Sequence, residues 1–294
     1  MRNILFFLIC FFSLASASPD DRANRKHMIN KIGYQGKMDL PNLNAVGKGK
    51  TVVLDYYFNN EYKKDSDGRL VRYHYTWEDQ ANSGFSGFGN IFRQSGAITE
   101  SLKTEPTRTT LGNADVYIIV DPDTEKETAS PHFVSSKDAD VIYEWVRSGG
   151  ALLLMGNDSA NAEFLHFNQL AGRFGIHFNE DCRNRVTGNH VETGAFYLGD
   201  HDVIFRTAKK IFIKEMSTLR LQKPANSAFS QGGDIIMAVS RVGKGTVFAV
   251  GDPWFYNEYL DRKNLPAEFE NDRAAKDLAE WLLLQSKKAG HTAG

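Results

Sequence analysis

The sequence predicts a three-layer α/β fold, in which helices cover both faces of a mostly parallel sheet and an antiparallel extension lies near the C-terminus. Two observations predict it. From residue 51 to residue 179, short apolar runs alternate with segments of helical spacing, which is typical of right-handed β-α-β crossovers. Over 234–252, two apolar runs are joined by RVGKG, which is typical of an antiparallel hairpin.

The elements follow from these patterns in chain order. A first strand begins in TVVLDYYFN at Thr51, and Gly-bounded segments of helical spacing indicate helices. The run 150–158, GALLLMGND, is apolar on both faces, as a central parallel strand should be. Ser135 or Ser136 should cap the helix that begins there and ends at Gly149. Besides the first strand and the strand over 150–158, we expect strands over 97–103, 115–121 and 176–179. We expect helices over 84–96, 135–149, 161–175 and 271–288.

The first residues have the character of an export signal. Residues 1–17 combine Arg2, an apolar stretch and an A-x-A cleavage site, so we expect a signal peptide that is removed after Ala17. Residues 18–50 are polar and should form a linker or wrapping arm, which leaves 51–288 as the α/β domain. The expected location is therefore the periplasm or the exterior, with no membrane attachment after the signal is removed. Cys182 would then be the only cysteine, so the fold should need no disulfide.

Composition excludes some classes of partner. The chain has 294 residues with 35 basic and 36 acidic side chains, whereas a nucleic-acid surface needs a basic excess. We find no P-loop, no G-x-G-x-x-G after a strand and no G-x-S-x-G elbow, and no cofactor is expected.

Polar side chains follow several of the predicted strands at the point where each strand ends. Because ligands of open α/β sheets bind beyond the carboxyl ends of the strands, these residues should share one cleft. The expected rim consists of Asp121, Asp123, Asn157, Asp158, Asp252, Trp254 and Asn257.

A second cluster lies in YHYTWEDQANSGFSGFG, residues 73–89. It sets aromatic rings beside carboxylates and amides, a combination that suits a carbohydrate, and we expect it to approach the same cleft. Its candidate substrate-binding residues are His74, Trp77, Asp79 and Asn82. The alternative is that Trp77 and Phe85 are core or interface aromatics.

Catalytic and metal roles have weaker support. Paired carboxylates could act on a glycosidic bond, with Asp121, Asp158 and Asp252 as candidates. Glu163 and His166 have an E-x-x-H spacing and could bind a metal together with Asp158, but capping and surface roles are favoured and no metal is expected.

Four stretches resemble the glutamine-amidotransferase-like domain that is appended to bacterial unsaturated rhamnogalacturonyl hydrolases: HYTWEDQANSGFSGFGNIF, VYIIVDPDTEKE, LLLMGNDSANAEFLHFNQLAGRFGIHFNED and GKGTVFAVGDPWFYNEY. The similarity runs from about Lys50 to the end of the chain. It implies a flavodoxin-like fold of the class I glutamine-amidotransferase type and a role in the breakdown of pectin or related uronic-acid polysaccharides.

The sequence departs from this pattern in two respects. The chain is too short to hold the (α/α)₆ barrel to which hydrolysis is attributed, so the hydrolase's catalytic residues have no counterparts here. Where amidotransferases have a nucleophilic cysteine after a central strand, this chain has Gly156, Asn157 and Asp158. Glutaminase chemistry is therefore not expected.

Three hypotheses follow. The leading one is an exported accessory or carbohydrate-binding module that acts on pectin-type oligosaccharides (rhamnogalacturonan, uronic acids) beside a partner glycoside hydrolase. The second is an enzyme, a glycan hydrolase or lyase that uses the strand-end carboxylates. The third is a structural interaction domain that packs on a partner hydrolase, which large aromatics and few convergent polar groups would favour.

Overall fold

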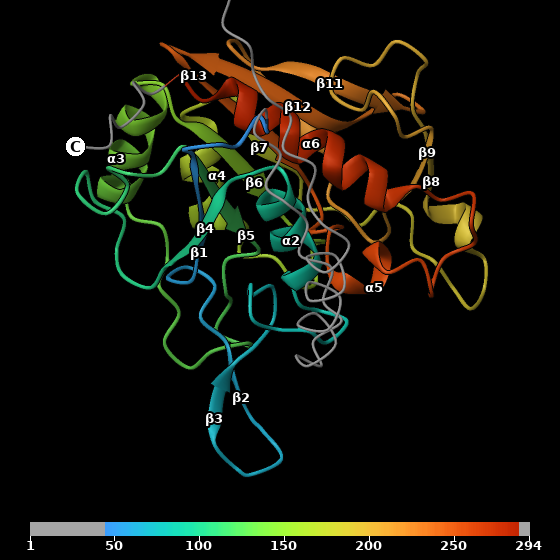
Figure 1. The fold of residues 1–294 in the computed structure, drawn as a ribbon, viewed down its shortest axis with the longest axis horizontal. Coiled ribbons are helices and arrows are strands. Elements are labelled where there is room, and N and C mark those ends of the chain that lie inside the picture. Colours follow the sequence, from blue (N-terminus) through green and yellow to red (C-terminus); the bar gives the residue numbers. More distant parts are fainter. Residues whose placement is uncertain (1–44, 288–294) are drawn as a thin grey trace, which may run out of the picture. The chain divides into compact units, whose positions relative to one another are not determined.

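The central sheet is mixed and runs through the whole domain (Figure 1). In the computed structural model, which describes residues 45–287, five neighbouring strands are parallel. In spatial order they are β4 (Ile98–Leu102), β1 (Thr51–Asp55), β5 (Val116–Val120), β6 (Ala151–Met155) and β13 (Gly245–Val250). The sheet continues with antiparallel β12 (Asp234–Val242), β10 (Leu219–Leu221) and β7 (Ile176–Phe178), and β11 (Asn226–Gln231) also pairs with β12.

Helices cover both faces of the parallel strands, because alternate strand residues point to opposite faces. Val52, Ile118 and Leu153 pack on one face with α2 (Ser86–Gln94) and α6 (Asn271–Gln285). On the other face, Tyr117 and Leu152 pack with α3 (Ser136–Arg147) and α4 (Phe164–Gly172). The predicted three-layer α/β fold with a mostly parallel sheet and an antiparallel extension is confirmed.

Local sequence signals account for several of these elements. Ser135 is the N-cap of α3, where it forms a reciprocal capping box with Asp138. The runs 234–242 and 245–250 pair as the expected antiparallel hairpin. Short elements complete the described chain: β2 (Tyr62–Lys64) with β3 (Leu70–Arg72), η1 (Val191–Gly194), β8 (Ala195–Tyr197) with β9 (Lys210–Phe212), and α5 (Asn257–Leu260).

One strand does not lie where the alternating pattern suggested. β7 follows α4 but pairs antiparallel with β10 at the far edge of the sheet, instead of extending the parallel set. The place beside β6 is taken by β13, whose six residues are all buried. β7 has three residues with a half-buried His177 at its centre, and it suits an edge.

The domain includes residues that the sequence assigned to a linker. The expected signal peptide 1–17 and most of the segment 18–50 lie outside the described residues. Val46 nevertheless packs against the core, and the Lys50 ammonium donates to the carbonyl oxygens of Leu283 and Ser286. Within 45–287, no helix has both the length and the apolar character that crossing a bilayer requires.

Candidate functional site

A polar cavity lies at the carboxyl ends of the parallel strands β5, β6 and β13. These strands are neighbours, so the loops that follow them meet at one edge of the sheet. The cavity has a volume of about 250 Å³. We call it the strand-end cavity, and its lining consists of His74, Tyr75, Asp121, Glu127, Asn157, Asn161, Lys214, Glu215, Asp252 and Tyr256.

Asp121 occupies the first position after β5 and is 3 % exposed. Its Oδ2 accepts a hydrogen bond of 2.7 Å from the Asn157 amide, whereas its Oδ1 has no hydrogen-bond partner among the described residues. Burial raises the pKa of Asp121 well above its ordinary value, and the Glu127 carboxylate adds to this effect. The Asn157 amide and the Tyr75 hydroxyl both favour the charged form of this carboxyl and so act to lower its pKa.

Asp252 follows β13 and is 4 % exposed. Its Oδ1 also lacks a hydrogen-bond partner within the described part of the chain. Burial raises the pKa of this carboxyl well above its ordinary value, and the Lys214 ammonium opposes the rise. A buried carboxyl in this state is protonated over a wider pH range, so it can donate as well as accept a hydrogen bond.

A histidine–carboxylate pair forms another part of the wall. The His74 Nδ1 lies 2.5 Å from Oε1 of Glu61, whose side chain is 5 % exposed. Because Nδ1 is engaged by Glu61, Nε2 is the ring nitrogen that remains available to a ligand. The ring is held flat against Tyr75, with centroids 3.9 Å apart. Glu61 thus fixes the orientation of the imidazole, as a carboxylate does in acid–base sites.

Backbone strain is concentrated at this cavity. Six non-glycine residues of the described chain have positive φ, and four of them line the cavity: His74 (65°), Tyr75 (52°), Asp121 (42°) and Glu215 (50°). Such conformations cost on the order of 1–3 kcal/mol each and cluster at functional sites. The cavity therefore has a conformation that packing alone would not select.

The electrostatic character of the cavity is acidic. Four carboxyls line it, those of Asp121, Glu127, Glu215 and Asp252, against the single ammonium of Lys214. An anionic ligand group would be repelled by the Glu127 and Glu215 carboxylates and could be held only beside the lysine, whose ammonium lies 3.6 Å from Glu215. The arrangement favours a neutral, hydroxyl-bearing ligand.

Two of the predicted rim carboxylates lie outside this lining. Oδ2 of Asp123 accepts from the Asn60 amide at 2.8 Å, and burial raises the pKa of Asp123 to about 7. Oδ1 of Asp158 accepts from the Ala160 amide at 2.8 Å and from the Asn161 side chain, while Oδ2 contacts the Cys182 thiol. Asp158 therefore stabilises the turn after β6 and is not a cavity residue.

The two tryptophans require a correction. Trp254 is fully buried in the core, where its ring packs on Phe255 with centroids 3.9 Å apart and an interplanar angle of 33°, so it does not face the cleft as the sequence suggested. Trp77 is 7 % exposed, donates from Nε1 to the carbonyl of Glu100 and packs on Phe88. Trp254 is therefore a core residue. Trp77 is largely a core residue as well, although it also lines a neighbouring cavity.

Two other predicted binding residues are engaged in holding loops together. Oδ1 and Oδ2 of Asp79 accept from the backbone amides of Ala81 and His74. The Asn257 side chain donates to the carbonyls of Asp79 and Ala81, and its Oδ1 accepts from the amide of Gly87. Asn82, by contrast, is exposed on the surface of the same loop.

The weak metal candidates are not brought together as a ligand set. Glu163 is the N-cap of α4 and accepts from the amides of His166 and Phe167, while its Oε1 lies 3.0 Å from Nδ1 of His166. Among residues 45–287 no group of three His, Cys, Asp or Glu side chains could hold a metal ion.

Sequence reasoning missed several cavity residues. Lys214 and Glu215 lie in an irregular segment between short strands, and no local pattern marks them. The same holds for Glu61, which contacts His74 but does not itself line the cavity. Tyr75 and Tyr256 stand beside predicted residues, yet only the folded structure brings their rings together, with centroids 6.1 Å apart. Glu127 belongs to the acidic turn after β5, and that turn was the one sequence pattern that could have identified it as a site residue.

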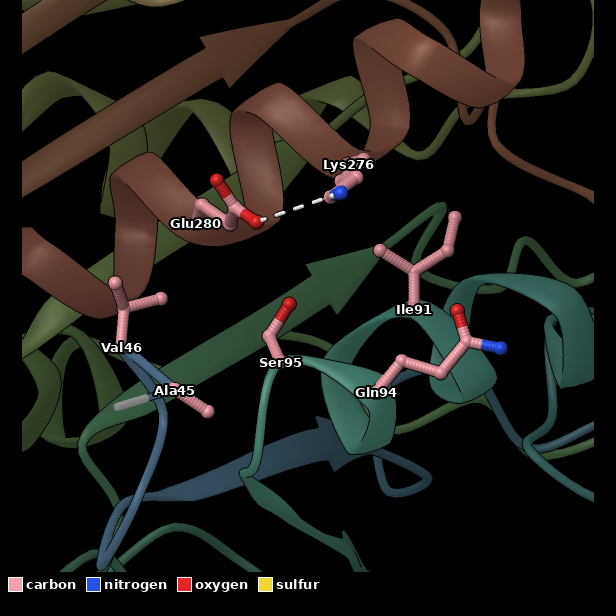
Figure 2. A pocket seen from close by; sticks show the side chains of 7 residues that line it. All are labelled: Ala45, Val46, Ile91, Gln94, Ser95, Lys276 and Glu280. Carbon is pink, nitrogen blue, oxygen red and sulfur yellow. Dashed lines mark ion pairs between the residues drawn. The ribbon is translucent and has the colours of Figure 1, made fainter. Parts of the chain in front are cut away.

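A separate cavity of about 190 Å³ lies between α2, α6 and the first described residues (Figure 2). Its ion pair, Lys276 with Glu280 at 4.0 Å, joins two residues of one helix. None of the buried, unpartnered polar atoms of the described chain belongs to its lining. The strand-end cavity is therefore the better candidate for a functional site.

Comparisons with known proteins place the fold but not the function. No protein-family model and no curated protein matches the chain. Its structure is similar to one described as the mmIFT52 N-terminal domain, with a TM-score of 0.59, 20 % identity, and coverage of 79 % of this chain and 97 % of that one.

Two proteins from Salmonella typhimurium are also similar in structure. One, from strain LT2, is described as cytoplasmic protein STM1381, with a TM-score of 0.53, 15 % identity, and coverage of 81 % of this chain and 100 % of that one. The other, cytoplasmic protein STM3548, has a TM-score of 0.51, 15 % identity, and coverage of 81 % and 99 %. Likeness at this identity supports a shared fold alone.

Proposed function

We propose that this chain is an exported carbohydrate-binding module that assists the breakdown of pectin-type oligosaccharides, and that the strand-end cavity binds one sugar unit. The observation that carries the proposal is the pair of buried carboxyls, Asp121 and Asp252, each with an oxygen that lacks a partner in the described chain. Unpartnered buried polar atoms are costly unless a ligand engages them.

The chemistry of the wall suits a sugar. Hydroxyl groups both donate and accept, so they can engage the Asp121 and Asp252 oxygens, the amides of Asn157 and Asn161, and the His74 ring at once. The cavity, at about 250 Å³, lies just below the size range of pockets for drug-sized ligands, which is appropriate for a single ring.

Charge refines the ligand. In rhamnogalacturonan a neutral deoxysugar alternates with a uronic acid, and the Glu127 and Glu215 carboxylates disfavour a uronate in the cavity. The neutral sugar is therefore the unit that binds there, with the carboxylate of the next unit directed away or toward Lys214.

A second function, acid–base catalysis on a glycosidic bond, has a specific observation in its favour. Two buried carboxyls with raised pKa line the cavity beside His74, whose ring Glu61 orients. Titratable groups with strongly shifted pKa values cluster at active sites. The third hypothesis, a purely structural domain, expects few convergent polar groups and gains no support from this cavity.

Two substitutions of one residue distinguish binding from catalysis. Asn at position 252 keeps a donor and an acceptor and mimics a protonated carboxyl, whereas Ala removes both. For a binding module, Asp252→Asn should leave the affinity for rhamnogalacturonan oligosaccharides within about threefold, and Asp252→Ala should lower it about tenfold or more. Titration calorimetry measures both, and chromatography of the mixtures reports products.

A matched control removes a buried carboxylate elsewhere. Asp277 is 3 % exposed and accepts from the amides of Thr207 and Ala208, so Asp277→Asn should lower stability without changing affinity. Product formation by the wild type that disappears in Asp252→Asn would instead establish the enzyme. Unchanged calorimetric titration in Asp252→Ala would exclude the cavity as the binding site.

Export and a partner hydrolase complete the proposal, and they rest on the signal-like N-terminus and on the family resemblance. Mature protein that begins near Ser18 and is recovered outside the cytosol would support export. Cytosolic protein that retains Met1 would overturn it.

A further inference from the structure

Two additional cavities continue from the strand-end cavity along the surface. The first, about 620 Å³, shares His74, Tyr75 and Tyr256 with the strand-end cavity, and we call it the middle section. The second, about 570 Å³, shares Asn82 with the middle section, and we call it the far section. Neighbouring cavities therefore have lining residues in common, and the three adjoin one another in the order strand-end cavity, middle section, far section.

The walls of the middle and far sections come from two distant parts of the chain, residues 74–93 and residues 256–263. Backbone hydrogen bonds join them: the Asn257 amide donates to Gly84 at 2.9 Å, and the Glu258 amide donates to Asn82 at 3.0 Å. The Asn257 side chain adds bonds to Ala81 and Gly87. The walls are thus fixed before any ligand binds, which lowers the entropic cost of binding.

The three sections differ in charge. The strand-end cavity carries four carboxyls against one lysine, whereas the far section carries Arg93 and Lys263 alongside Glu78 and Asp261. The middle section has the half-buried ring of Tyr256, against which a sugar face can pack, whereas the Tyr75 ring is 5 % exposed and stacked on His74. The two cations and two carboxylates of the far section balance, and Lys263 lies 3.4 Å from Asp261, so the far section repels an acidic unit less than the cavity does.

From these shared lining residues we infer that the three cavities form one groove, which binds a linear oligosaccharide of at least three units, with a neutral unit in the strand-end cavity and an acidic unit near Arg93 and Lys263. The inference rests on the proposed function and extends it from one sugar to a chain. Asn82 stands at the boundary between the middle and far sections and is exposed, so a larger side chain there would obstruct the far section and leave the cavity intact.

The test uses rhamnogalacturonan oligosaccharides of two, four and six units in calorimetric titrations of the wild type and of Asn82→Trp. The wild type should bind four units at least tenfold more tightly than two, with little further gain at six. Asn82→Trp should bind two units as the wild type does but lose the preference for four. Asn189→Trp is the matched control, because Asn189 is exposed and lines none of these cavities.

The outcomes separate the two levels of the proposal. Equal affinity for two and four units in the wild type overturns the groove and leaves the single-sugar site standing. A full preference for four units in Asn82→Trp also overturns it, since the added units would then bind elsewhere. Absence of binding at every length overturns the proposed function and the groove with it.

Discussion

Replacing Asp252 with Asn removes a titratable group from the strand-end cavity but keeps the size of the side chain. Oδ1 of Asp252 has no partner within the described residues, so the amide breaks no hydrogen bond there. Burial raises the pKa of the carboxyl well above its ordinary value of 3.8, with Lys214 partly opposing the rise. We expect the variant to be more stable than the wild type at neutral pH.

The size of the effect follows from proton linkage. Between the unfolded and the folded pKa of Asp252, the folded state binds a proton that the unfolded state has lost, so the free energy of unfolding falls as pH rises. The slope for one such group is about 1.4 kcal/mol per pH unit. The destabilisation caused by the buried Asp252 carboxyl is absent below its unfolded pKa and grows as the pH approaches its folded pKa. Asp55, whose pKa burial raises to about 6, has the same sign and is unchanged in the variant.

Urea unfolding at about pH 4.5 and pH 5.5 measures this directly. The difference in unfolding free energy between Asp252→Asn and the wild type should increase by about 1 kcal/mol over that interval. Asp200→Asn, which removes a carboxylate whose side chain is 84 % exposed, corrects for the loss of one negative charge. A difference that does not change with pH would refute the claim that Asp252 is buried and protonated.

Four further outcomes are expected. Asn257→Ala should loosen the walls of the groove and weaken binding of a four-unit oligosaccharide more than of a two-unit one, as calorimetry will show. Cys182→Ser should leave binding unchanged and neither form should hydrolyse glutamine, because burial raises the pKa of this thiol and disfavours a reactive thiolate; ammonia release is the assay. Trp254→Ala should lower the free energy of unfolding by about 3–5 kcal/mol, as expected for a core ring. Asp115→Ala should cost about 1–3 kcal/mol in urea unfolding without affecting affinity, since both oxygens of Asp115 accept hydrogen bonds far from the cavity.

The elements that sequence predicted well are those with local causes. The expected helix over 135–149 is observed as Ser136–Arg147, because a capping box starts it and Gly149, with φ of 126°, follows it. The hairpin over 234–252 is correct because its turn and its two apolar runs are adjacent in sequence. The position of β7 depended on competition with β13 for the place beside β6, which no local pattern encodes.

Only the part of the candidate site that lies at the ends of the parallel strands could be predicted from the sequence. Asp121, Asn157 and Asp252 each follow a parallel strand, and the common direction of those strands brings them to one cavity with His74. Trp254 was misplaced because residues just beyond a strand can point either to the cleft or to the core, and an apolar ring is more stable in the core.

The two ends of the parallel strands contrast in a way that bears on function. At the amino end of β5, Oδ2 of Asp115 accepts from the Thr51 amide at 3.0 Å and Oδ1 accepts from the Ser286 hydroxyl at 2.8 Å. At the carboxyl end, Asp121 and Asp252 are buried with oxygens that no described residue engages, and Asp121 also has a strained backbone. A fold selected for stability alone would satisfy both edges equally, since each unsatisfied buried group costs about 1–3 kcal/mol. Buried unpartnered atoms also occur elsewhere in the described chain, for example on Arg72 and Trp254, but those of Asp121 and Asp252 belong to the lining of the cavity, where ligand binding is the physical compensation that would explain why these groups are retained.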